Sequence, residues 1–408
     1  MANNNNNKIL NVPNLRFPEF TGEWKKCKLG DVANLTKGVG ISKGQKSSKG
    51  NPCILYGELY TTYKSEMITD IVSKTNIDSA NLAKSKYNDV IIPSSGETAI
   101  DISTARCVQY NDVLLGGDLN IIRLNDGNDG SFFSYQLNGV RKRDIAKVAQ
   151  GVSVVHLYGE TLKTIKVNSP ELVEQNKISS LLCLIDQRIS TQNKIIDKLE
   201  SLIKGLNNEF HNNIEGKSTA FSEFGEAYSG LSGKNSDSFG SGKPYITYMN
   251  VYKNHHIDNN QYGLVTISND EKQSRVSYGD ILFTLSSETP KEVGIGSIYL
   301  GNDDELYLNS FCFGVHIKNN NVIYPPYMAY FLSCQYFRKI IYPLAQGSTR
   351  FNLQKGDFMK TPFVIPILKQ QKQIAYILDS LSNKAILEKR RLGLLQTEKL
   401  YLLQQMFI

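Results

Sequence analysis

The stretch Pro170-Glu-Leu-Val-Glu-Gln175-Asn-Lys-Ile178-Ser-Ser-Leu-Leu182 decides how this chain is built. It recurs as Pro366-Ile-Leu-Lys-Gln-Gln371-Lys-Gln-Ile374-Ala-Tyr-Ile-Leu378, so that Pro, Gln, Ile and Leu repeat at an offset of 196 residues. The units of solenoid proteins are much shorter, roughly 20–50 residues. The offset therefore indicates a tandem duplication of one large module.

The duplication extends over both halves of the chain. Gly50-x-Pro52-x-Ile54-x-Tyr56-x-x-x-Tyr60 recurs as Gly242-x-Pro244-x-Ile246-x-Tyr248-x-x-x-Tyr252, at an offset of 192 residues. The other matches are Tyr87-x-Asp89 with Tyr278-x-Asp280, Ser95-x-Glu97-Thr98 with Ser286-x-Glu288-Thr289, Leu119-Asn120 with Leu308-Asn309, and Ala149-Gln150-Gly151 with Ala345-Gln346-Gly347. All of them keep their order along the chain, which chance similarity would not do.

Each module begins with a part of mixed secondary structure. Short apolar runs at 89–92 and 280–283 predict strands, and clusters of Gly, Asn and Asp between such runs predict turns. Segments 132–148 and 327–342 predict the helices that close this part. We therefore expect two similar α+β domains.

Each module ends in a long helix whose apolar residues form a heptad seam. The steps along the seam alternate between four and three over about 40 residues, or roughly 60 Å of helix. The seam of the first helix is Ile178, Leu182, Ile185, Ile189, Gln192, Ile196, Leu199, Ile203, Leu206 and Phe210. The seam of the second helix is Ile374, Leu378, Leu381, Ala385, Glu388, Leu392, Leu395, Lys399, Leu402 and Met406. This length exceeds the width of a small domain, which favours a coiled coil over helices packed only on their own domains.

These features predict the order of the segments. We expect a disordered tail at 1–12, a first domain at 13–170, a coiled-coil helix at 171–215, a second domain at 216–366 and a second coiled-coil helix at 367–408. If the helices pair along their seams, the second must run antiparallel to the first, because the two modules are alike. The predicted fold is therefore two similar α+β domains separated by two long antiparallel coiled-coil helices, with an internal pseudo-two-fold repeat.

Composition limits the class of protein. The 408 residues are 40% hydrophobic, which is enough for two or three domains with real cores. A formal net charge of +7 suits a polyanionic partner. The six cysteines include no CxxC pair and no apolar run is long enough to span a membrane, so we expect a cytoplasmic protein with free thiols.

The sequence holds no convincing catalytic motif. Its five histidines include no HExxH, and Gly240-Ser-Gly-Lys243 is no phosphate loop, because Asp237 and Pro244 replace the first Gly and the final Ser or Thr. Pro325-Pro326-Tyr327 is similar to an adenine methyltransferase motif, but Tyr324 stands where that motif has Asp or Asn. We interpret the two prolines as the start of a helix and expect no catalytic residue and no metal site.

The start of the chain and its exit into the second long helix resemble specificity subunits of bacterial type I restriction-modification systems. The start is Val12-Pro-Asn-Leu-Arg-Phe-Pro-Glu-Phe20, then Gly22-Glu-Trp24 and Leu29-Gly-Asp-Val32. The exit is Ala345-Gln-Gly-Ser-Thr-Arg-Phe-Asn-Leu353, then Pro366 and Gln371-x-x-Ile374. The first module has Val152-Ser153-Val154 where the second has Ser348-Thr349-Arg350, so a DNA role for that Arg is not carried over to it.

The resemblance implies a division of labour between subunits. Each domain would be a target-recognition domain that binds one half of a bipartite target in double-stranded DNA. The helices would set the spacer and dock two modification subunits, which bind S-adenosylmethionine and methylate adenine. Restriction subunits would join for translocation and cleavage with ATP and Mg, and none of these cofactors would bind to this chain.

Two alternatives belong to other functional classes. A fused methyltransferase–specificity protein is disfavoured, because the sequence has no methyltransferase core. A coiled-coil scaffold that binds only proteins is disfavoured by the duplicated domains, and a salt-dependent DNA shift assay would distinguish it.

Three sets of residues are candidates for DNA contact. Basic loops rich in Gly and Ser reach phosphates well, and they hold Lys37, Lys43, Lys46, Lys49, Lys234 and Lys243. The loops after the repeated Ala-Gln-Gly hold Ser153, His156, Ser348, Thr349, Arg350 and Asn352, among which Arg and Asn suit guanine and adenine edges. The third set follows presumed strands: Ser95, Thr98, Ser286 and Thr289. The alternatives are solvated loops for the lysines and turn capping for the third set. Further basic candidates, whose alternative is a polar helix face, lie in the closing segments: Arg141, Lys142, Arg143, Arg338 and Lys339.

Overall fold

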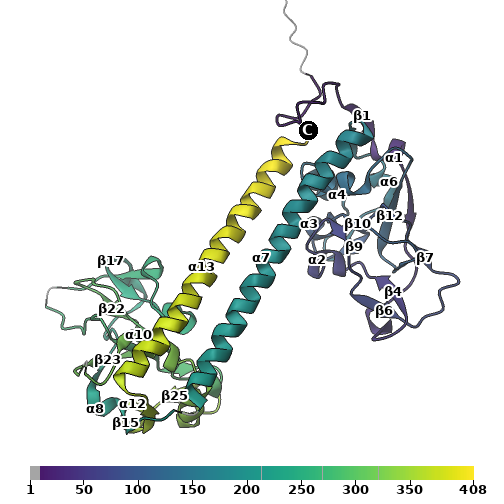
Figure 1. Ribbon diagram of the computed structural model, residues 1–408. Coiled ribbons are helices and arrows are strands. Elements are labelled where there is room, and N and C mark those ends of the chain that lie inside the picture. Colours follow the sequence, from purple (N-terminus) through teal and green to yellow (C-terminus); the bar gives the residue numbers. More distant parts are fainter. Residues whose placement is uncertain (1–9, 213, 269, 320) are drawn as a thin grey trace, which may run out of the picture. The chain divides into compact units, whose positions relative to one another are not determined.

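The structure of the chain, a computed structural model, describes residues 10–212, 214–268, 270–319 and 321–408 (Figure 1). The chain divides into two compact units. Unit 1 comprises the described residues up to Asn193 together with Arg390–Ile408, and unit 2 comprises the described residues of Lys194–Lys389. Each unit holds one mixed domain and one stretch of each of two long helices.

The predicted tail at 1–12 lies outside the described residues up to position 9. Asn11 is held in place by Trp24. The side-chain amide of Asn11 donates to the Trp24 carbonyl at 2.6 Å, and the backbone N–H of Trp24 donates to the Asn11 carbonyl at 2.9 Å. The end of the segment predicted as a tail therefore packs on the domain of unit 1.

Two mixed sheets form the domain of unit 1, in the orders β2-β12-β8-β10-β5 and β3-β6-β4-β11-β7. The strands of the first sheet are β2 (Ala33–Lys37), β12 (Leu119–Leu124), β8 (Asp89–Pro93), β10 (Arg106–Val108) and β5 (Met67–Ile68). Those of the second are β3 (Lys46–Ser47), β6 (Ser73–Thr75), β4 (Asn51–Ile54), β11 (Leu114–Leu115) and β7 (Ala83–Lys84). The helices of this domain are α1 (Leu29–Val32), α2 (Glu58–Thr61), α3 (Ala99–Ile102), α4 (Gly130–Asn138), α5 (Lys142–Val148) and α6 (Gly159–Leu162), and β1 (Lys25–Lys28) pairs with β14 (Lys166–Ser169). The central strand β8 is buried throughout, which explains its unbroken apolar run.

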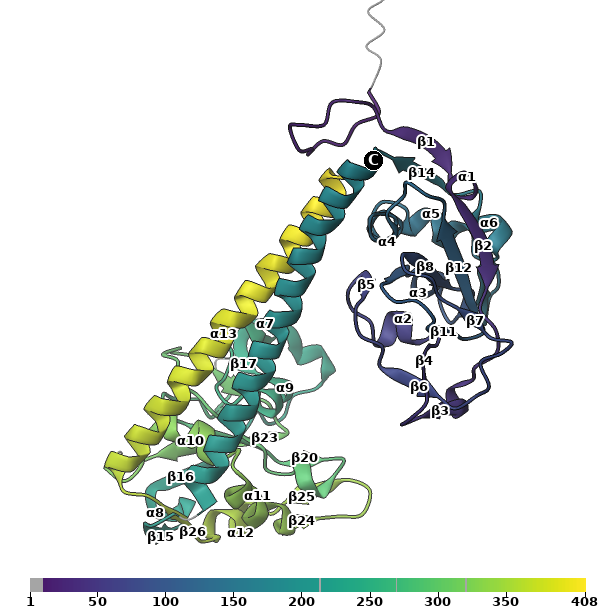
Figure 2. The ribbon, with the colours of Figure 1, turned by 45° about the vertical axis from the view of Figure 1, so that its right-hand side comes forward.

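The domain of unit 2 is built in the same way, from sheets in the orders β16-β23-β19-β21 and β18-β17-β22. Their strands are β16 (Gly225–Ser229), β23 (Cys312–Ile317), β19 (Ile281–Thr284), β21 (Gly296–Ile298), β18 (Tyr262–Val265), β17 (Phe239–Ile246) and β22 (Tyr307–Leu308). Its helices are α8 (Phe221–Phe224), α9 (Tyr248–Lys253), α10 (Pro325–Phe331), α11 (Gln335–Ile341) and α12 (Lys355–Lys360), and β15 (Lys217–Thr219) pairs with β26 (Phe363–Ile365). A third, small sheet has the order β20-β25-β24, and these three strands lie side by side (Figure 2).

The shared topology corrects one of the sequence matches. β4 is parallel to β11 and β17 is parallel to β22, with Leu115 opposite Ile54 and Leu308 opposite Ile246. The predicted match of Leu119-Asn120 with Leu308-Asn309 is therefore wrong, because Leu308 corresponds to Leu115. A Leu begins or ends several buried strands here, so two residues could not fix the register.

Both predicted closing helices are broken into two. Segment 132–148 contains α4 and α5, because Gly139 ends α4. Segment 327–342 contains α10 and α11, which Cys334 separates in an extended conformation. The interpretation of the Pro-Pro pair is confirmed, since Pro325 and Pro326 open α10.

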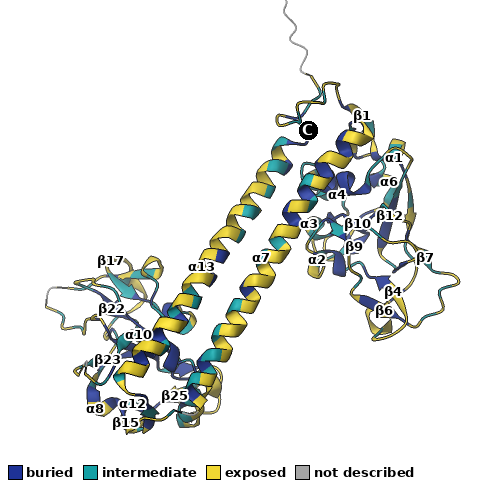
Figure 3. Cartoon of the chain, viewed as in Figure 1, coloured by how far each residue is buried: buried dark blue, intermediate teal, exposed yellow. Residues whose placement is uncertain are grey.

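The two long helices are α7 (Leu172–Asn212) and α13 (Leu368–Gln405). Every residue of the two predicted seams is buried or half-buried, and most of the remaining helix surface is exposed (Figure 3). The heptad prediction is confirmed, including the polar seam positions Gln192, Glu388 and Lys399.

In unit 1 the two helices complete the core of the domain. Ile178 and Leu182 of α7 lie in one buried cluster with Leu403 of α13 and the domain's apolar side chains. Further along α7, Asp186 pairs with Lys399 at 2.7 Å, so the two stretches run antiparallel. Each large apolar side chain buried in this way contributes about 1.5–3 kcal/mol.

In unit 2 the same arrangement holds for the other stretches of the helices. Glu200 of α7 pairs with Lys389 of α13 at 2.6 Å, and Phe210 packs against the cluster that contains Leu378, so the stretches are antiparallel. The helices therefore pair with each other and also pack on their own domains. The sequence had presented these two arrangements as alternatives.

A buried glutamine fixes the start of each long helix. Gln175 donates to the Pro170 carbonyl at 2.8 Å and accepts from the backbone N–H of Asp129 at 2.8 Å. Gln371 donates to the Pro366 carbonyl at 2.9 Å and accepts from the backbone N–H of Tyr324 at 2.9 Å. The repeated Pro and Gln therefore share one role, which is to join the long helix to the start of α4 or α10.

Candidate nucleic-acid interface

Each domain carries a short hairpin at the same place in the repeat. In unit 1, Gln150 and His156 exchange two backbone hydrogen bonds of 2.9 and 2.7 Å around the loop 151–155. In unit 2, β24 (Ala345–Gln346) pairs with β25 (Phe351–Leu353), around the loop 347–351. The two loops are one element present twice.

A short strand from the centre of the domain supports each hairpin. β13 (Val155–His156) pairs with β9 (Ser95–Gly96), and β25 pairs with β20 (Ser286–Ser287). Since β9 and β20 directly follow the buried strands β8 and β19, each hairpin is fixed to the central sheet of its own domain.

A glycine opens each loop. Gly151 and Gly347 have φ angles of +121° and +131°, which side chains rarely allow. A Cβ atom would lie 2.1 Å from the Val154 carbonyl oxygen in the first loop and 2.2 Å from the Arg350 carbonyl oxygen in the second. The repeated Ala-Gln-Gly is therefore explained by the backbone, and Val154 and Arg350 occupy equivalent positions.

The two loops share this backbone but expose different side chains. Those of the first loop are Val152, Ser153 and Val154, and those of the second are Ser348, Thr349 and Arg350. The guanidinium of Arg350 lies 5.5 Å from the ring centre of Phe311, which is itself exposed. A guanidinium over an aromatic ring keeps its donors available for a ligand.

An exposed aromatic ring also follows the first hairpin. The ammonium of Lys37 lies 5.9 Å from the ring centre of Tyr158, and the ring of His156 stacks on Tyr158 at 6.2 Å. Asn352, at the position of His156, is exposed in unit 2. Tyr158 and Phe311 were not among the predicted site residues, because only the folded chain brings these rings to Lys37 and Arg350.

The Thr candidates of the third set cap turns. The Thr98 hydroxyl donates to Asp101 at 2.6 Å and accepts from the Asp101 backbone N–H at 3.1 Å, at the start of α3. The Thr289 hydroxyl donates to Glu292 at 2.8 Å. Both hydroxyls therefore have local partners, as the capping alternative predicts. Ser95 and Ser286, the serines of the same set, are buried beneath the hairpins.

The lysines of the basic loops fall into two groups. Those that form ion pairs are Lys46 with Glu58 at 2.6 Å, Lys234 with Glu271 at 2.5 Å, and Lys243 with Glu305. The Lys234 ammonium lowers the pKa of Glu271 to about 2, and only 6% of the Lys234 side chain is exposed. The others are exposed, and they are Lys37, Lys43 and Lys49. The exposed group can approach phosphates without breaking an ion pair.

Two arginines of the closing helices hold the fold together. Arg338 donates to the carbonyls of Gly294, Val293 and Lys291 at 2.6–2.8 Å, and burial lowers its pKa to about 10. Arg141 donates to the Ile408 carbonyl at 2.6 Å. These contacts favour a structural role for both side chains.

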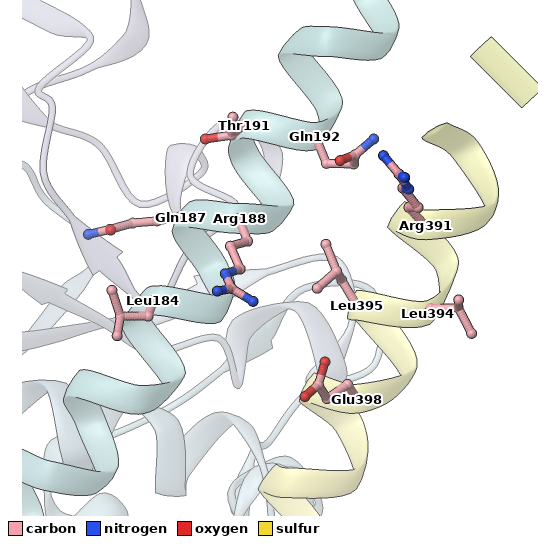
Figure 4. A pocket seen from close by; sticks show the side chains of 9 residues that line it. All are labelled: Leu184, Gln187, Arg188, Thr191, Gln192, Arg391, Leu394, Leu395 and Glu398. Carbon is pink, nitrogen blue, oxygen red and sulfur yellow. The ribbon is translucent and has the colours of Figure 1, made fainter. Parts of the chain in front are cut away.

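An open groove of about 600 Å³ lies between α7 and α13 in unit 1. Its lining combines apolar, basic and acidic side chains, and consists of Leu184, Gln187, Arg188, Thr191, Gln192, Arg391, Leu394, Leu395 and Glu398. Arg188 and Gln192 point from α7 towards α13, and Arg391 and Leu395 point back (Figure 4). Further apolar side chains are exposed on the two helices, among them Ile195, Leu202, Ile386, Leu387, Leu400 and Tyr401.

Among the residues that the structure describes, His, Cys, Asp and Glu side chains nowhere gather in a group of three that could hold a metal ion. Within the same residues, no helix combines the length and the apolar character that crossing a membrane requires.

Comparison with known proteins gives consistent matches over nearly the whole chain. Residues 21–201 and 222–396 each match the family described as the type I restriction modification DNA specificity domain. The type I restriction enzyme MjaVIII specificity subunit of Methanocaldococcus jannaschii is 24% identical over 413 residues, which cover 94% of this chain and 91% of that protein.

Solved structures show the same fold. The S subunit of a type I restriction-modification system from M. genitalium superimposes with a TM-score of 0.60 at 17% identity, over 97% of this chain and 99% of that one. A chain from a structure on complex assembly and conformational transition of the type I R-M system gives 0.58 at 14% identity, over 94% and 97%.

Proposed function

Because this chain belongs to the family of type I restriction modification DNA specificity domains, we propose that it is the DNA-reading specificity subunit of a type I restriction-modification complex. Its domains, at 13–170 and 216–366, each read one half of a bipartite target in double-stranded DNA. The duplicated hairpin carries this proposal, since its backbone is kept in both domains while its exposed side chains differ. Two domains that recognise different half-sites can share one backbone for the loop, but they need different side chains to contact different bases.

The charges around the hairpins suit the DNA backbone and the bases. Lys37, Lys43 and Lys49 are exposed cations in unit 1, and each phosphate that they neutralise makes binding more sensitive to salt. Arg350 and Asn352 have the side-chain chemistry that pairs bidentately with guanine and adenine in the major groove. Lysines already held by a carboxylate, such as Lys234, are weaker candidates.

We infer that the long helices, at 171–215 and 367–408, dock two modification subunits and that restriction subunits join the complex. The groove beside Leu184 and Leu395 and the exposed apolar side chains of α7 and α13 support this role, because large apolar side chains on a polar helix favour a protein partner. S-adenosylmethionine, ATP and Mg then belong to the partner subunits, and the complex works in the cytoplasm with its DNA.

Reconstitution tests the function directly. The purified chain alone should transfer no methyl group, and adding the modification subunits and S-adenosylmethionine should produce adenine methylation at one bipartite sequence. Replacing residues 13–170 with the equivalent domain of a relative should change one half of that sequence and leave the other unchanged. A swap that altered both halves, or methylation by the isolated chain, would contradict the proposal.

A further inference from the structure

The first hairpin exposes two apolar side chains at its tip. Val152 is 97% exposed and Val154 is 53% exposed, although both are β-branched apolar residues. Val155, the next residue, is buried and supports the loop from below. Single exposed apolar residues are common on protein surfaces. A role for this pair therefore depends on its place in the domain and on the backbone that holds the loop.

Backbone hydrogen bonds hold the loop on both sides of the pair. The loop is closed by the two hydrogen bonds between Gln150 and His156, and Leu157 donates to the Ser94 carbonyl at 2.9 Å directly after it. Gly151 fixes the turn with a backbone conformation that other residues rarely adopt. The two valines are therefore presented in a defined direction.

The equivalent loop of unit 2 carries polar side chains at the same positions. Val154 has the place of Arg350, and Val152 has the place of Ser348, on the same glycine-opened backbone. Arg350 is the strongest base-reading candidate of unit 2. The valines thus stand where unit 2 has its candidate for base reading, and their side chains carry no hydrogen-bond donor or acceptor.

We propose that Val152 and Val154 read a thymine of the first half-site by packing against its 5-methyl group in the major groove. Every other feature of the base edges in that groove that distinguishes the base pairs is a donor or an acceptor, and only the thymine methyl group matches an apolar side chain. Lys37 and His156, beside Tyr158 at the base of the hairpin, provide the polar contacts that bring the loop to the DNA. The inference rests on the proposed DNA-reading function and assigns its chemistry in one half-site.

The test uses the full chain assembled with its modification subunits, on duplexes of the target found by methylome sequencing. Each thymine is replaced in turn by deoxyuridine, which removes only the 5-methyl group. Burial of one methyl group corresponds to about 0.8 kcal/mol, or about a fourfold change in Kd. We expect that loss at a thymine of one half-site. We expect it to vanish in the variant V152S/V154S, because serine carries no methyl group that could pack against the thymine.

The matched control is S348A, at the equivalent position in the second loop, which should leave the deoxyuridine effect intact. If no thymine is sensitive, or if V152S/V154S keeps the sensitivity, the inference is wrong while target recognition stands. A first half-site without any thymine on either strand would overturn it as well. Loss of all sequence preference in the wild-type complex would instead overturn the proposed function.

Discussion

The ammonium nitrogen of Lys399 lies 2.6 Å from a carboxylate oxygen of Glu66, which joins the last turns of α13 to the domain of unit 1. The same ammonium lies 2.7 Å from Asp186 of α7, and the Tyr135 hydroxyl donates to Asp186 at 2.8 Å. Burial opposes the charge of Lys399, but the two carboxylates outweigh it and raise the pKa of Lys399 above its ordinary value. At the equivalent position of the other seam stands Ile203, so one of the two corresponding junctions is ionic and the other apolar.

Replacing Lys399 by Met should destabilise unit 1 strongly. The substitution removes the ammonium that pairs with both buried carboxylates, and it leaves Glu66 with only the more distant Arg106 at 3.9 Å. Breaking a buried ion pair from one side costs about 3–5 kcal/mol. Urea unfolding followed by circular dichroism measures the effect. The matched control is K389M, which removes an exposed pair with Glu200 on the same two helices and should change stability by less than about 1 kcal/mol. Equal effects of the two substitutions would contradict this account.

The stability of unit 2 should fall as the pH drops from about 7 to 5. His211 is buried against Tyr327, donates from Nδ1 to the Asn207 carbonyl at 2.6 Å, and accepts at Nε2 from the Tyr327 hydroxyl at 3.0 Å. Burial lowers the pKa of His211, and burial also lowers that of the half-buried His256. At a pH below about 6.5 the unfolded chain therefore binds more protons than the folded chain. The stability that the neutral histidines contribute is fully present above about pH 6.5 and is lost as the pH falls further.

Each such histidine contributes a slope of up to about 1.4 kcal/mol per pH unit. Denaturant unfolding at closely spaced pH values measures that slope. The variant H211Q keeps a polar side chain of similar reach and should show a shallower slope. An identical slope in H211Q and wild type would exclude His211 as a contributor.

The fold followed from sequence wherever periodicity and repetition agreed. The seams from Ile178 and Ile374 combine a heptad pattern with a fixed offset, and the structure buries or half-buries all of their residues. The break at Gly139 was missed because hydrophobic periodicity continues across it, while a glycine only sometimes ends a helix. The wrong match of Leu119-Asn120 shows that short apolar strands fix register only through their hydrogen-bonded partners.

The candidate site followed from sequence only in part. The repeated Ala-Gln-Gly located both hairpins, because a positive φ at Gly151 and Gly347 leaves a trace in the sequence. Whether a lysine is exposed or paired depends on side chains far along the chain, as for Lys234 and Glu271. The contact between Phe311 and Arg350 likewise depends on the order of the strands in the sheet, which cannot be read from the spacing of residues in the sequence.

Substituting the loop glycines should damage one half-site at a time. A Cβ atom at Gly151 would collide with the Val154 carbonyl, and one at Gly347 with the Arg350 carbonyl, so each loop must change its path. We expect G151A and G347A to cost about 1–3 kcal/mol of local strain and to relax recognition of different half-sites. Methylation of a randomised target library measures both. G393A serves as control, because nothing lies within 4 Å of its new Cβ atom, and it should leave both half-sites unchanged.

Arg350 and Lys43 should respond differently to removal. R350A should cost about 1–3 kcal/mol on the cognate sequence and relax one base position, because a bidentate base contact is lost. K43A should weaken binding to all sequences alike and reduce the salt slope by about one, as a phosphate contact does. Binding titrations at several salt concentrations on cognate and non-cognate duplexes separate the two patterns. A uniform loss in R350A would reassign Arg350 to the DNA backbone.

The helices should act as a ruler for the spacer between the half-sites. Four residues inserted after Asp197 and four after Gly393, positions related by the 196-residue offset, would lengthen each helix by about 6 Å. Since base pairs rise about 3.4 Å, the preferred spacer should grow by close to two pairs with both half-sites unchanged. Four residues are also a stutter in a heptad, so local unwinding turns the domains and can shift the result by one pair. An insertion in one helix alone puts the seams out of register and should impair folding or docking of the partner subunits. If the doubly inserted chain assembled and kept the original spacer, the junctions between domains and helices would set the distance instead.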